Sequence, residues 1–218
     1  MPRFYSIIKN EEYGIGCTGQ TVWVWDKNDT VVAKFKDLIY AYISAISPIG
    51  DIFVVKSNTG RLAVYSLKDF RLIKKFRFSK DTFPHDEGMC FSSDGKYFLN
   101  IERRDDEFKL GISIYDTSDF SIVSKSLFVD RRMIYHIQEV NREFYVLGYM
   151  RGDDGIRSYD FVAKYRDNDM CDMKKITESE GEFYYAHLFQ TMFGSMLNDG
   201  QKIKKVYTLA DLWSYYNN

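Results

Sequence analysis

The side chains best suited to chemistry are three histidines, and they stand in no known catalytic pattern. They are His85, His136 and His187. We expect His136 and His187 in the first strands of neighbouring repeats, where a metal ion or an acid–base pair could use them. The interpretation we favour is a hydrogen-bonded structural histidine at each position. No nucleophile elbow, phosphate-binding loop or zincin helix is found, so the sequence predicts no catalytic residue, no cofactor and no metal site.

Acidic residues gather at Asp153-Asp154-Gly155, where they could contact a cation. Calcium takes six to eight oxygen ligands, and the sequence shows no such loop. The overlapping Arg151-Gly152-Asp153 has an integrin-type pattern, which we interpret as chance because Met1 to Ser6 lack the apolar stretch of a signal peptide. No run approaches the roughly 18 apolar residues of a membrane span. We therefore expect a cytoplasmic chain.

A repeat along the chain predicts the elements that would position any site. Five segments each contain a strand that ends in an aromatic residue, with an aspartate four residues later. The aromatic residues are Trp25, Tyr65, Tyr115, Tyr165 and Tyr207, and the aspartates are Asp29, Asp69, Asp119, Asp169 and Asp211. Because the repeat is 40 to 50 residues long and predicts four antiparallel strands, it indicates propeller blades.

The aromatic strand is expected to be the third of its repeat and buried on both faces. The aspartate after it should accept backbone N–H groups in the following turn. The next strand should be the fourth and outermost, because lysine there is a common protection of an exposed sheet edge. These lysines are Lys34, Lys74, Lys75, Lys125, Lys174 and Lys175.

The fold class we predict is all-β: a single-domain β-propeller, residues 1–218, with five four-stranded antiparallel blades. Their approximate bounds are 3–37, 39–79, 86–129, 133–177 and 182–218. The fifth repeat is the least regular, because residues 183–193 also fit an amphipathic helix. We prefer strands there, since Val206 to Leu212 matches Val64 to Phe70 position by position.

Composition narrows the range of partners. The net charge is -1, with 30 basic and 31 acidic residues, so no overall field attracts the chain to nucleic acid or to an anionic membrane. Cys17, Cys90 and Cys171 are widely spaced and odd in number. We therefore expect free thiols and neither a disulfide framework nor a zinc site.

Three segments carry a resemblance to a known family. They are Thr21 to Asp26, whose strand ends in Trp25-Asp26, the Ser93-Asp94-Gly95-Lys96 turn with its flanking strands, and Ile114-Tyr115-Asp116. In these the chain resembles the WD-repeat propellers and their looser bacterial relatives. The family's Gly-His dipeptide is absent, and Ser66, Arg166 and Thr208 replace Asp after the strand in the other repeats. The resemblance implies a propeller and a non-enzymatic protein-interaction module.

In such a repeat, the loops between the second and third strands emerge on the same face as the linkers between repeats. These loops are longest in the third and fourth repeats. We expect residues 81–87, 103–107, 130–132 and 151–157 to converge there and to dock a protein partner of unknown identity. The candidate binding residues are Arg103, Arg104, Asp105, Asp106, Arg131, Arg132, Arg151, Asp153 and Asp154.

Two alternatives remain open. A small-ligand or glycan-binding propeller would need an aromatic and amide pocket repeated in every blade, whereas the loops differ between repeats. A glycosidase would need two carboxyl groups about 5 to 10 Å apart, and the expected first strands offer chiefly Glu139.

Overall fold

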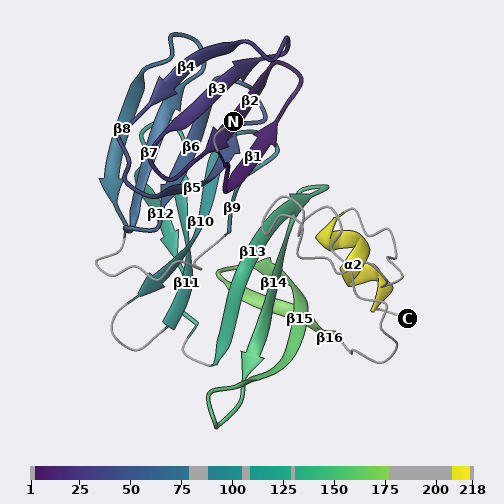
Figure 1. Cartoon of the computed structure of the whole chain (residues 1–218). Coiled ribbons are helices and arrows are strands. Elements are labelled where there is room, and N and C mark those ends of the chain that lie inside the picture. Colours follow the sequence, from purple (N-terminus) through teal and green to yellow (C-terminus); the bar gives the residue numbers. More distant parts are fainter. Residues whose placement is uncertain (1–2, 79–87, 105–108, 129–130, 177–207, 217–218) are drawn as a thin grey trace, which may run out of the picture. The chain divides into compact units, whose positions relative to one another are not determined.

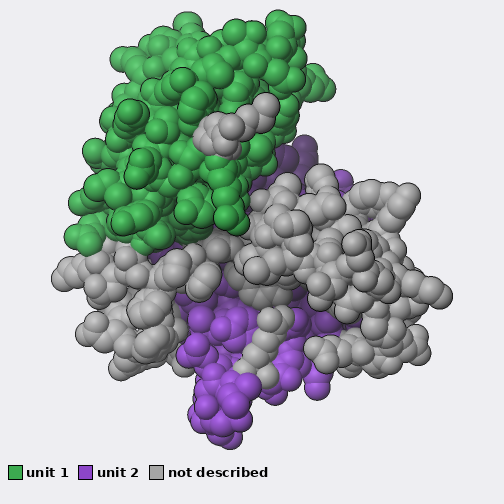
Figure 2. All heavy atoms as spheres, viewed as in Figure 1, with its two compact units in different colours: residues 1–85 green, residues 86–218 purple. Residues whose placement is uncertain are grey.

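The computed structural model describes the chain except for residues 1–2, 79–87, 105–108, 129–130, 177–207 and 217–218. The described residues form four antiparallel sheets of four strands each, together with one helix (Figure 1). The chain divides into two compact units, residues 1–85 and 86–218 (Figure 2). The expected all-β fold is therefore confirmed. No helix in the described ranges is long and apolar enough to cross a membrane.

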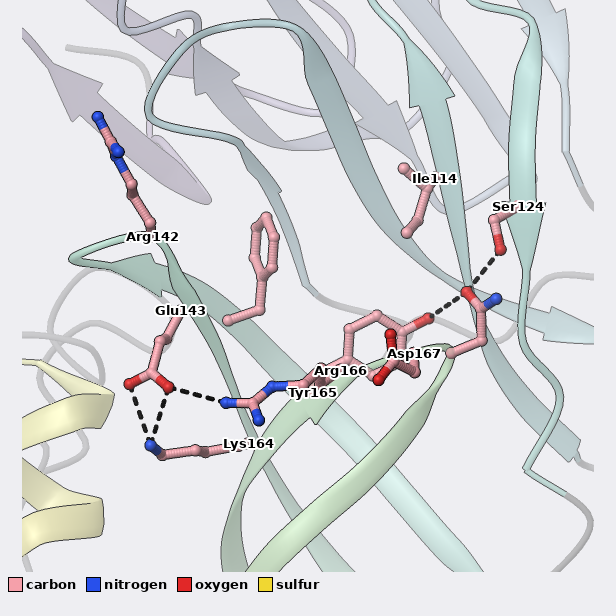
Figure 3. A pocket seen from close by; sticks show the side chains of 10 residues that line it. Ile114, Ser124, Arg142, Glu143, Lys164, Tyr165, Arg166 and Asp167 are labelled. Atoms are coloured by element: carbon pink, nitrogen blue, oxygen red, sulfur yellow. Dashed lines mark hydrogen bonds and ion pairs between the residues drawn. The ribbon is translucent and has the colours of Figure 1, made fainter.

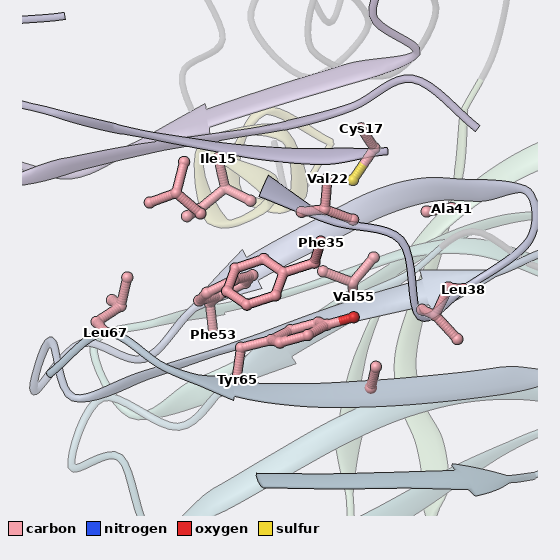
Figure 4. Close-up of a cluster of buried hydrophobic side chains, with 12 residues drawn as sticks. Ile15, Cys17, Val22, Phe35, Leu38, Ala41, Phe53, Val55, Tyr65 and Leu67 are labelled. Carbon is pink, nitrogen blue, oxygen red and sulfur yellow. The ribbon is translucent and has the colours of Figure 1, made fainter. Parts of the chain in front are cut away.

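Unit 1 holds the first and second sheets, in each of which every strand pairs with the next along the chain. The first sheet contains β1 (Ser6–Lys9), β2 (Tyr13–Cys17), β3 (Val22–Asp26) and β4 (Val31–Phe35). The second sheet contains β5 (Ala41–Ile46), β6 (Ile52–Ser57), β7 (Arg61–Ser66) and β8 (Leu72–Arg77). Their apolar residues meet in one core, in which Tyr65 stacks on Phe53 and Phe35 packs at a tilt against both rings (Figure 4).

Unit 2 holds the third and fourth sheets, with the same strand order. The third sheet contains β9 (Met89–Phe91), β10 (Tyr97–Arg104), β11 (Lys109–Asp116) and β12 (Ile122–Lys125). The fourth sheet contains β13 (Arg132–Val140), β14 (Glu143–Arg151), β15 (Arg157–Arg166) and β16 (Asp169–Ile176). The two sheets share a core in which Leu99 and Ile112 of the third belong to the same cluster as Phe161 and Ala163 of the fourth.

The repeated aromatic residue lies on the third strand of all four sheets, as predicted. In the last three it is paired with a phenylalanine of the second strand: Phe53 with Tyr65, Phe98 with Tyr115 and Phe144 with Tyr165. The fourth strand is the edge of every sheet, and its predicted lysines lie on β4, β8, β12 and β16. The solvent-facing position of these strands explains why lysine is tolerated there.

The fifth repeat departs from the prediction. Residues 209–215 form the helix α2 (Leu209–Tyr215) and not an outer strand. Its N-cap is Thr208, whose hydroxyl accepts the N–H of Asp211 while the Asp211 carboxylate accepts the N–H of Thr208. This reciprocal capping box starts a helix, so Asp211 is not a turn residue after a third strand. The rest of the expected fifth blade, including Tyr207, lies outside the described residues.

The predicted aspartate accepts a backbone N–H group in two of the four described sheets. Asp119 accepts the N–H of Ser121 at 2.7 Å, as expected. Asp29 and Asp69 instead form exposed ion pairs with basic side chains, at 2.8 and 2.6 Å. Asp169 is the first residue of β16, where it accepts the N–H of the next residue.

In three sheets the residue directly after the aromatic accepts the turn's N–H groups. Asp26 Oδ1 accepts two of them, from Asn28 and Thr30, each at 2.9 Å. Ser66 Oγ accepts those of Lys68 and Asp69, and Asp116 Oδ1 accepts that of Ser118. A short oxygen side chain at the end of a strand reaches the N–H groups two to four residues later. The Asp, Ser and Asp at this position therefore perform the same structural role.

Candidate functional site

The loop end of unit 2, defined by Arg131 and residues 151–157, contains part of the predicted binding face. Arg131 precedes β13, and its guanidinium forms an ion pair with Asp153 in the loop between β14 and β15. The backbone joins the same two segments, because Arg151 N donates to Arg131 O at 3.0 Å. The exposed fractions of the Arg131 and Asp153 side chains are 53% and 97%. The linker and the loop thus meet in solvent, as the sequence predicts for these residues.

The loop itself is held in one conformation by local hydrogen bonds. Gly152 N donates to Ile156 O at 2.7 Å, and Asp154 Oδ1 accepts the N–H of Ile156 at 2.8 Å. Gly155 has φ +77, a left-handed conformation that favours glycine. The carboxylate of Asp154 is therefore used to shape the turn, whereas that of Asp153 faces solvent.

Not every predicted binding residue is presented on this surface. The Arg132 side chain is only 16% exposed and pairs with Asp169 at 3.4 Å, and its guanidinium carbon lies 5.3 Å from the centre of the Phe128 ring. Arg151 is half-buried. The Arg132 side chain is therefore engaged with Asp169 and the Phe128 ring within unit 2.

Two further predicted residues, Arg103 and Arg104, lie on the third sheet. Arg103 and Arg104 end β10, opposite Leu110 and Lys109, and Leu110 forms a bridge with Phe128, just before the linker to β13. The backbone thus places Arg103 two strands away from the segment that leads to Arg131. Asp105, Asp106 and residues 81–87 lie outside the described residues.

We call the end of unit 2 that carries the β13–β14 and β15–β16 turns its turn end. A hollow of about 430 Å³ lies there, which the sequence did not predict (Figure 3). Its walls come from β11 and β12 of the third sheet and from two turns of the fourth. The lining residues are Ile114, Ser124, Arg142, Glu143, Phe144, Lys164, Tyr165, Arg166, Asp167 and Asn168. The two turns, Asn141-Arg142 and Asp167-Asn168, have positive φ at both residues, the geometry of a tight two-residue hairpin.

Charge in the hollow is organised around Glu143. Its carboxylate accepts from Lys164 Nζ at 2.9 and 3.0 Å and from Arg166 at 3.1 Å. The bond from Lys164, followed by that from Tyr145, lowers the pKa of Glu143. Arg142 is exposed and extends away from Glu143 in Figure 3. The hollow therefore presents a cationic side chain beside an apolar wall, a combination that suits an anionic group.

Unit 2 also buries a carboxyl group among neutral donors. Glu102 on β10 is 1% exposed and accepts from Asn100 Nδ2 at 3.2 Å, from Ser113 Oγ at 2.7 Å and from the Tyr115 hydroxyl. Such a network can fix the pairing of neighbouring strands. These three donors come from β10 and β11, and the carboxyl group is closed to solvent, so the hydrogen bonds join the two strands.

Two candidate side chains for chemistry, His136 and Glu139, lie among the described residues. His136 lies on β13, as predicted, and burial lowers its pKa to about 4, so it is neutral near pH 7. Glu139 accepts from Ser93 Oγ at 3.1 Å. No three His, Cys, Asp or Glu side chains in the described part of the chain are placed to hold a metal ion. His85 and His187 lie outside it.

The cysteines are free thiols, as predicted. Burial raises the pKa of Cys17 to about 12 and also raises that of Cys90. The thiolate is the nucleophilic and metal-binding form of cysteine. Neither side chain is therefore prepared for nucleophilic chemistry near neutral pH.

No family model matches the chain, and no curated protein matches it. Many solved structures are similar in fold, and three of them are described here. U3-55K is 11% identical, with a TM-score of 0.60, over 78% of this chain and 52% of its own. The WD40 domain of Toxoplasma gondii coronin is 14% identical, with a TM-score of 0.55, over 77% and 44%. The WD40 domain of Neurospora crassa Pan2 is 11% identical, with a TM-score of 0.58, over 79% and 52%.

These likenesses confirm the coarser part of the prediction, an all-β fold of four-stranded antiparallel sheets, and do not confirm five blades. The four-stranded antiparallel sheets are similar to those of WD40 domains, which confirms the resemblance drawn from Trp25-Asp26 and the Asp94-Gly95 turn. The chain spans about half the length of the three structures. At such low identity the comparison concerns the fold and says nothing of a partner.

Proposed function

We propose that the chain is a non-enzymatic protein-interaction module and that its partner docks on the loop end of unit 2. The observation that carries the proposal is the exposed pair of Arg131 and Asp153, which joins a linker to a loop held by its own hydrogen bonds. Rigid strands beneath a charged loop are a usual way for a scaffold to present a binding surface. WD-repeat propellers are in general scaffolds for protein interactions, which supports the same class of function by analogy.

The predicted residues have three roles in this interaction: contact with the partner, support of the loop and anchoring of β13. Arg131 and Asp153 contact the partner directly, with Arg103, Arg104, Asp105 and Asp106 completing the surface from the third sheet. Asp154 and Arg151 hold the loop, and Arg132 anchors the start of β13. An exposed arginine is suited to such a surface because its planar guanidinium can bind a partner's carboxylate with two hydrogen bonds.

The test is a charge swap within the pair. The single variants Arg131→Glu and Asp153→Arg should each reduce capture of the native partner by at least tenfold, measured by quantitative pull-down from the host. The double variant restores the ion pair with reversed polarity, so it should keep the melting temperature and still fail to capture. Arg71→Glu, at an ion pair of unit 1 with a 74% exposed arginine, is the matched control. Capture that survives the double variant would show that the partner binds elsewhere.

A small anionic ligand in the hollow at the turn end is the second candidate function. Its volume falls within the range of small-molecule sites, and its lining combines apolar and charged groups as such sites do. Phe144 and Tyr165 line the same hollow as Arg142, so a sugar acid or an organic phosphate would find both a ring and a cation. Titration calorimetry with inorganic phosphate and with a uronic acid tests this, with Arg142→Ala as the variant that should abolish binding.

A further inference from the structure

Glu143 connects the hollow at the turn end of unit 2 to the helix α2. It lines the hollow, and its carboxylate accepts from Lys164 Nζ at 2.9 and 3.0 Å and from the Tyr145 hydroxyl at 2.9 Å. Both donors also contact Trp213 of α2. Lys164 Nζ lies 4.4 Å from the centre of the Trp213 ring, and the ring centres of Tyr145 and Trp213 are 6.3 Å apart. In Figure 3 the yellow ribbon of α2 lies beside Glu143 and Lys164.

The helix depends on the fourth sheet for its stability. Leu209 and Leu212 pack into a buried cluster with residues of β14 and β15, and Trp213 Nε1 donates to Asp172 O at 2.8 Å. A helix of seven residues is too short to be stable by itself in water. A change in the position of Lys164, which contacts Trp213, should therefore alter the docking of α2.

The charges that line the hollow can accommodate one further anionic group. Arg142, Lys164 and Arg166 are basic and Glu143 and Asp167 are acidic, so the lining has a net charge of +1. Glu143 forms ion pairs with both Lys164 and Arg166. An anion in the hollow adds a second acceptor for the same cations, and hydrogen bonds between charged groups are among the strongest in proteins. The anion and Glu143 therefore compete for Lys164.

We propose that an anion bound in the hollow weakens the docking of α2 through Glu143 and Lys164. This inference rests on the second candidate function, the binding of a small anion in the hollow, and adds a regulatory consequence to it. An ammonium group within about 6 Å of the centre of an aromatic ring is attracted to its face. When Lys164 turns toward the anion, Trp213 loses this attraction. Glu143 is a positioning residue in this scheme, because it acts on α2 through other side chains.

The coupling also has to work in the opposite direction. If an anion weakens the docking of α2, then docked α2 weakens the binding of the anion by the same factor. Replacement of Trp213 by an aliphatic residue removes the ring that attracts Lys164. The variant Trp213→Leu should therefore bind the anion more tightly, by at least about fivefold, the lower end of typical couplings between sites.

The test follows the resonance of Trp213 in the full chain. The three tryptophans are replaced by 5-fluorotryptophan, and the variant Trp213→Phe assigns the fluorine resonance that belongs to α2. Inorganic phosphate and glucuronate should each shift this resonance, with the same midpoint as the binding measured by titration calorimetry. Glucose is the neutral control for glucuronate. Circular dichroism of every variant confirms that the sheets are kept.

Two variants examine the path without relying on the ligand alone. Glu143→Gln removes the charge that holds Lys164, so it should shift the Trp213 resonance before any anion is added. Lys174→Gln is the matched control, because Lys174 Nζ lies 5.4 Å from the centre of the same Trp213 ring but is not one of the described residues that line the hollow. It should shift the resonance of the free protein and leave the further shift caused by phosphate unchanged.

The outcomes separate the coupling from the ligand site. A phosphate-dependent shift together with tighter binding in Trp213→Leu supports the proposal. Phosphate binding that leaves either the resonance or the Trp213→Leu affinity unchanged overturns the coupling and leaves the ligand site intact. An unchanged resonance in Glu143→Gln, or a phosphate-dependent shift lost in Lys174→Gln, overturns the coupling as well. If calorimetry detects neither anion, the ligand site is wrong and the coupling is overturned with it.

Discussion

The same repeat position is used in two physically different ways in the two units. In unit 1, Tyr65 stacks between Phe35 and Phe53, at 4.3 and 4.9 Å between ring centres, and its hydroxyl makes one long bond of 3.4 Å to Asp37. In unit 2, Tyr115 occupies the equivalent place, but its hydroxyl donates to the buried carboxyl group of Glu102. One unit is therefore stabilised at this point by apolar area, and the other by a closed polar network.

The difference shows that the repeat specifies geometry more strictly than chemistry. Both tyrosines stand opposite a phenylalanine of the second strand, so the backbone register is the same. What fills the space around the ring is set by the neighbours: apolar residues in unit 1, and Asn100, Glu102 and Ser113 in unit 2. A stack of apolar rings is destabilised when a polar side chain replaces one of them. A buried hydrogen-bond network is destabilised when the removal of one side chain leaves another polar group without its partner.

The largest effect is expected in the aromatic stack of unit 1. Phe53→Ala removes a fully buried ring that touches both partners, and such truncations cost about 3 to 5 kcal/mol of unfolding free energy. Urea denaturation followed by circular dichroism measures it. Tyr65→Phe keeps the stack and loses only the long hydroxyl bond, so it should cost less than about 1 kcal/mol. Equal losses in the two variants would contradict the apolar origin of stability here.

The polar network of unit 2 should respond next. Glu102→Ala leaves three buried donors without their common acceptor, and we expect a loss of about 3 kcal/mol. Tyr115→Phe removes a single donor and should cost about 1 kcal/mol, clearly more than Tyr65→Phe. Urea denaturation of the four variants completes the comparison. If Tyr115→Phe proved as mild as Tyr65→Phe, the network would contribute no more than the stack at this position.

The sequence predicted the positions of the third strands, but not the structure of the fifth repeat or the side chains that surround each repeated aromatic residue. The spacing of Trp25, Tyr65, Tyr115 and Tyr165 located four third strands, because the distance between repeats survives changes of the residues around them. The same spacing gave the wrong structure at Asp211. Thr208 and Asp211 form a capping box, and the same residue types can serve either the turn after a strand or the start of a helix. Local sequence cannot decide between them when tertiary packing, here of Leu209 and Leu212, sets the outcome.

For the candidate site, the sequence predicted which backbone segments meet but not the directions of their side chains. The rule that strand-two-to-three loops and linkers share one end of a sheet correctly brought Arg131 to Asp153. It could not foresee that Arg132 turns toward Asp169, because side-chain direction depends on residues that are distant in sequence. The hollow lined by Arg142 and Lys164 was missed, although Asn141-Arg142 and Asp167-Asn168 are recognisable as two-residue turns at the same end.

The stability of unit 2 should depend on pH because it holds the buried side chain of His136. The pKa of His136 is about 4 in the folded chain against an ordinary value of 6.5, so the unfolded chain binds the extra proton between these values. Stability therefore falls as pH decreases from about 6.5 to about 4, by at most ~1.4 kcal/mol for each pH unit from this residue. Urea denaturation at pH 7, 6 and 5 should show the slope, and His136→Gln should flatten it. A variant with the unchanged slope would assign the dependence to other groups.

The smallest effects separate two aspartates within one turn of unit 1. Asp26 accepts two backbone N–H groups, so Asp26→Ala should cost about 1 kcal/mol, the net value of a typical hydrogen bond. Asp29 has φ +58 and only an exposed ion pair with Lys9. Asparagine also tolerates this conformation, so Asp29→Asn should change stability by no more than ~0.5 kcal/mol. Thermal unfolding of both variants at low and at high salt measures the difference, and only the small Asp29 effect should vanish in salt. A larger loss of stability in Asp29→Asn than in Asp26→Ala would show that Asp29, the aspartate of the repeat, stabilises the turn.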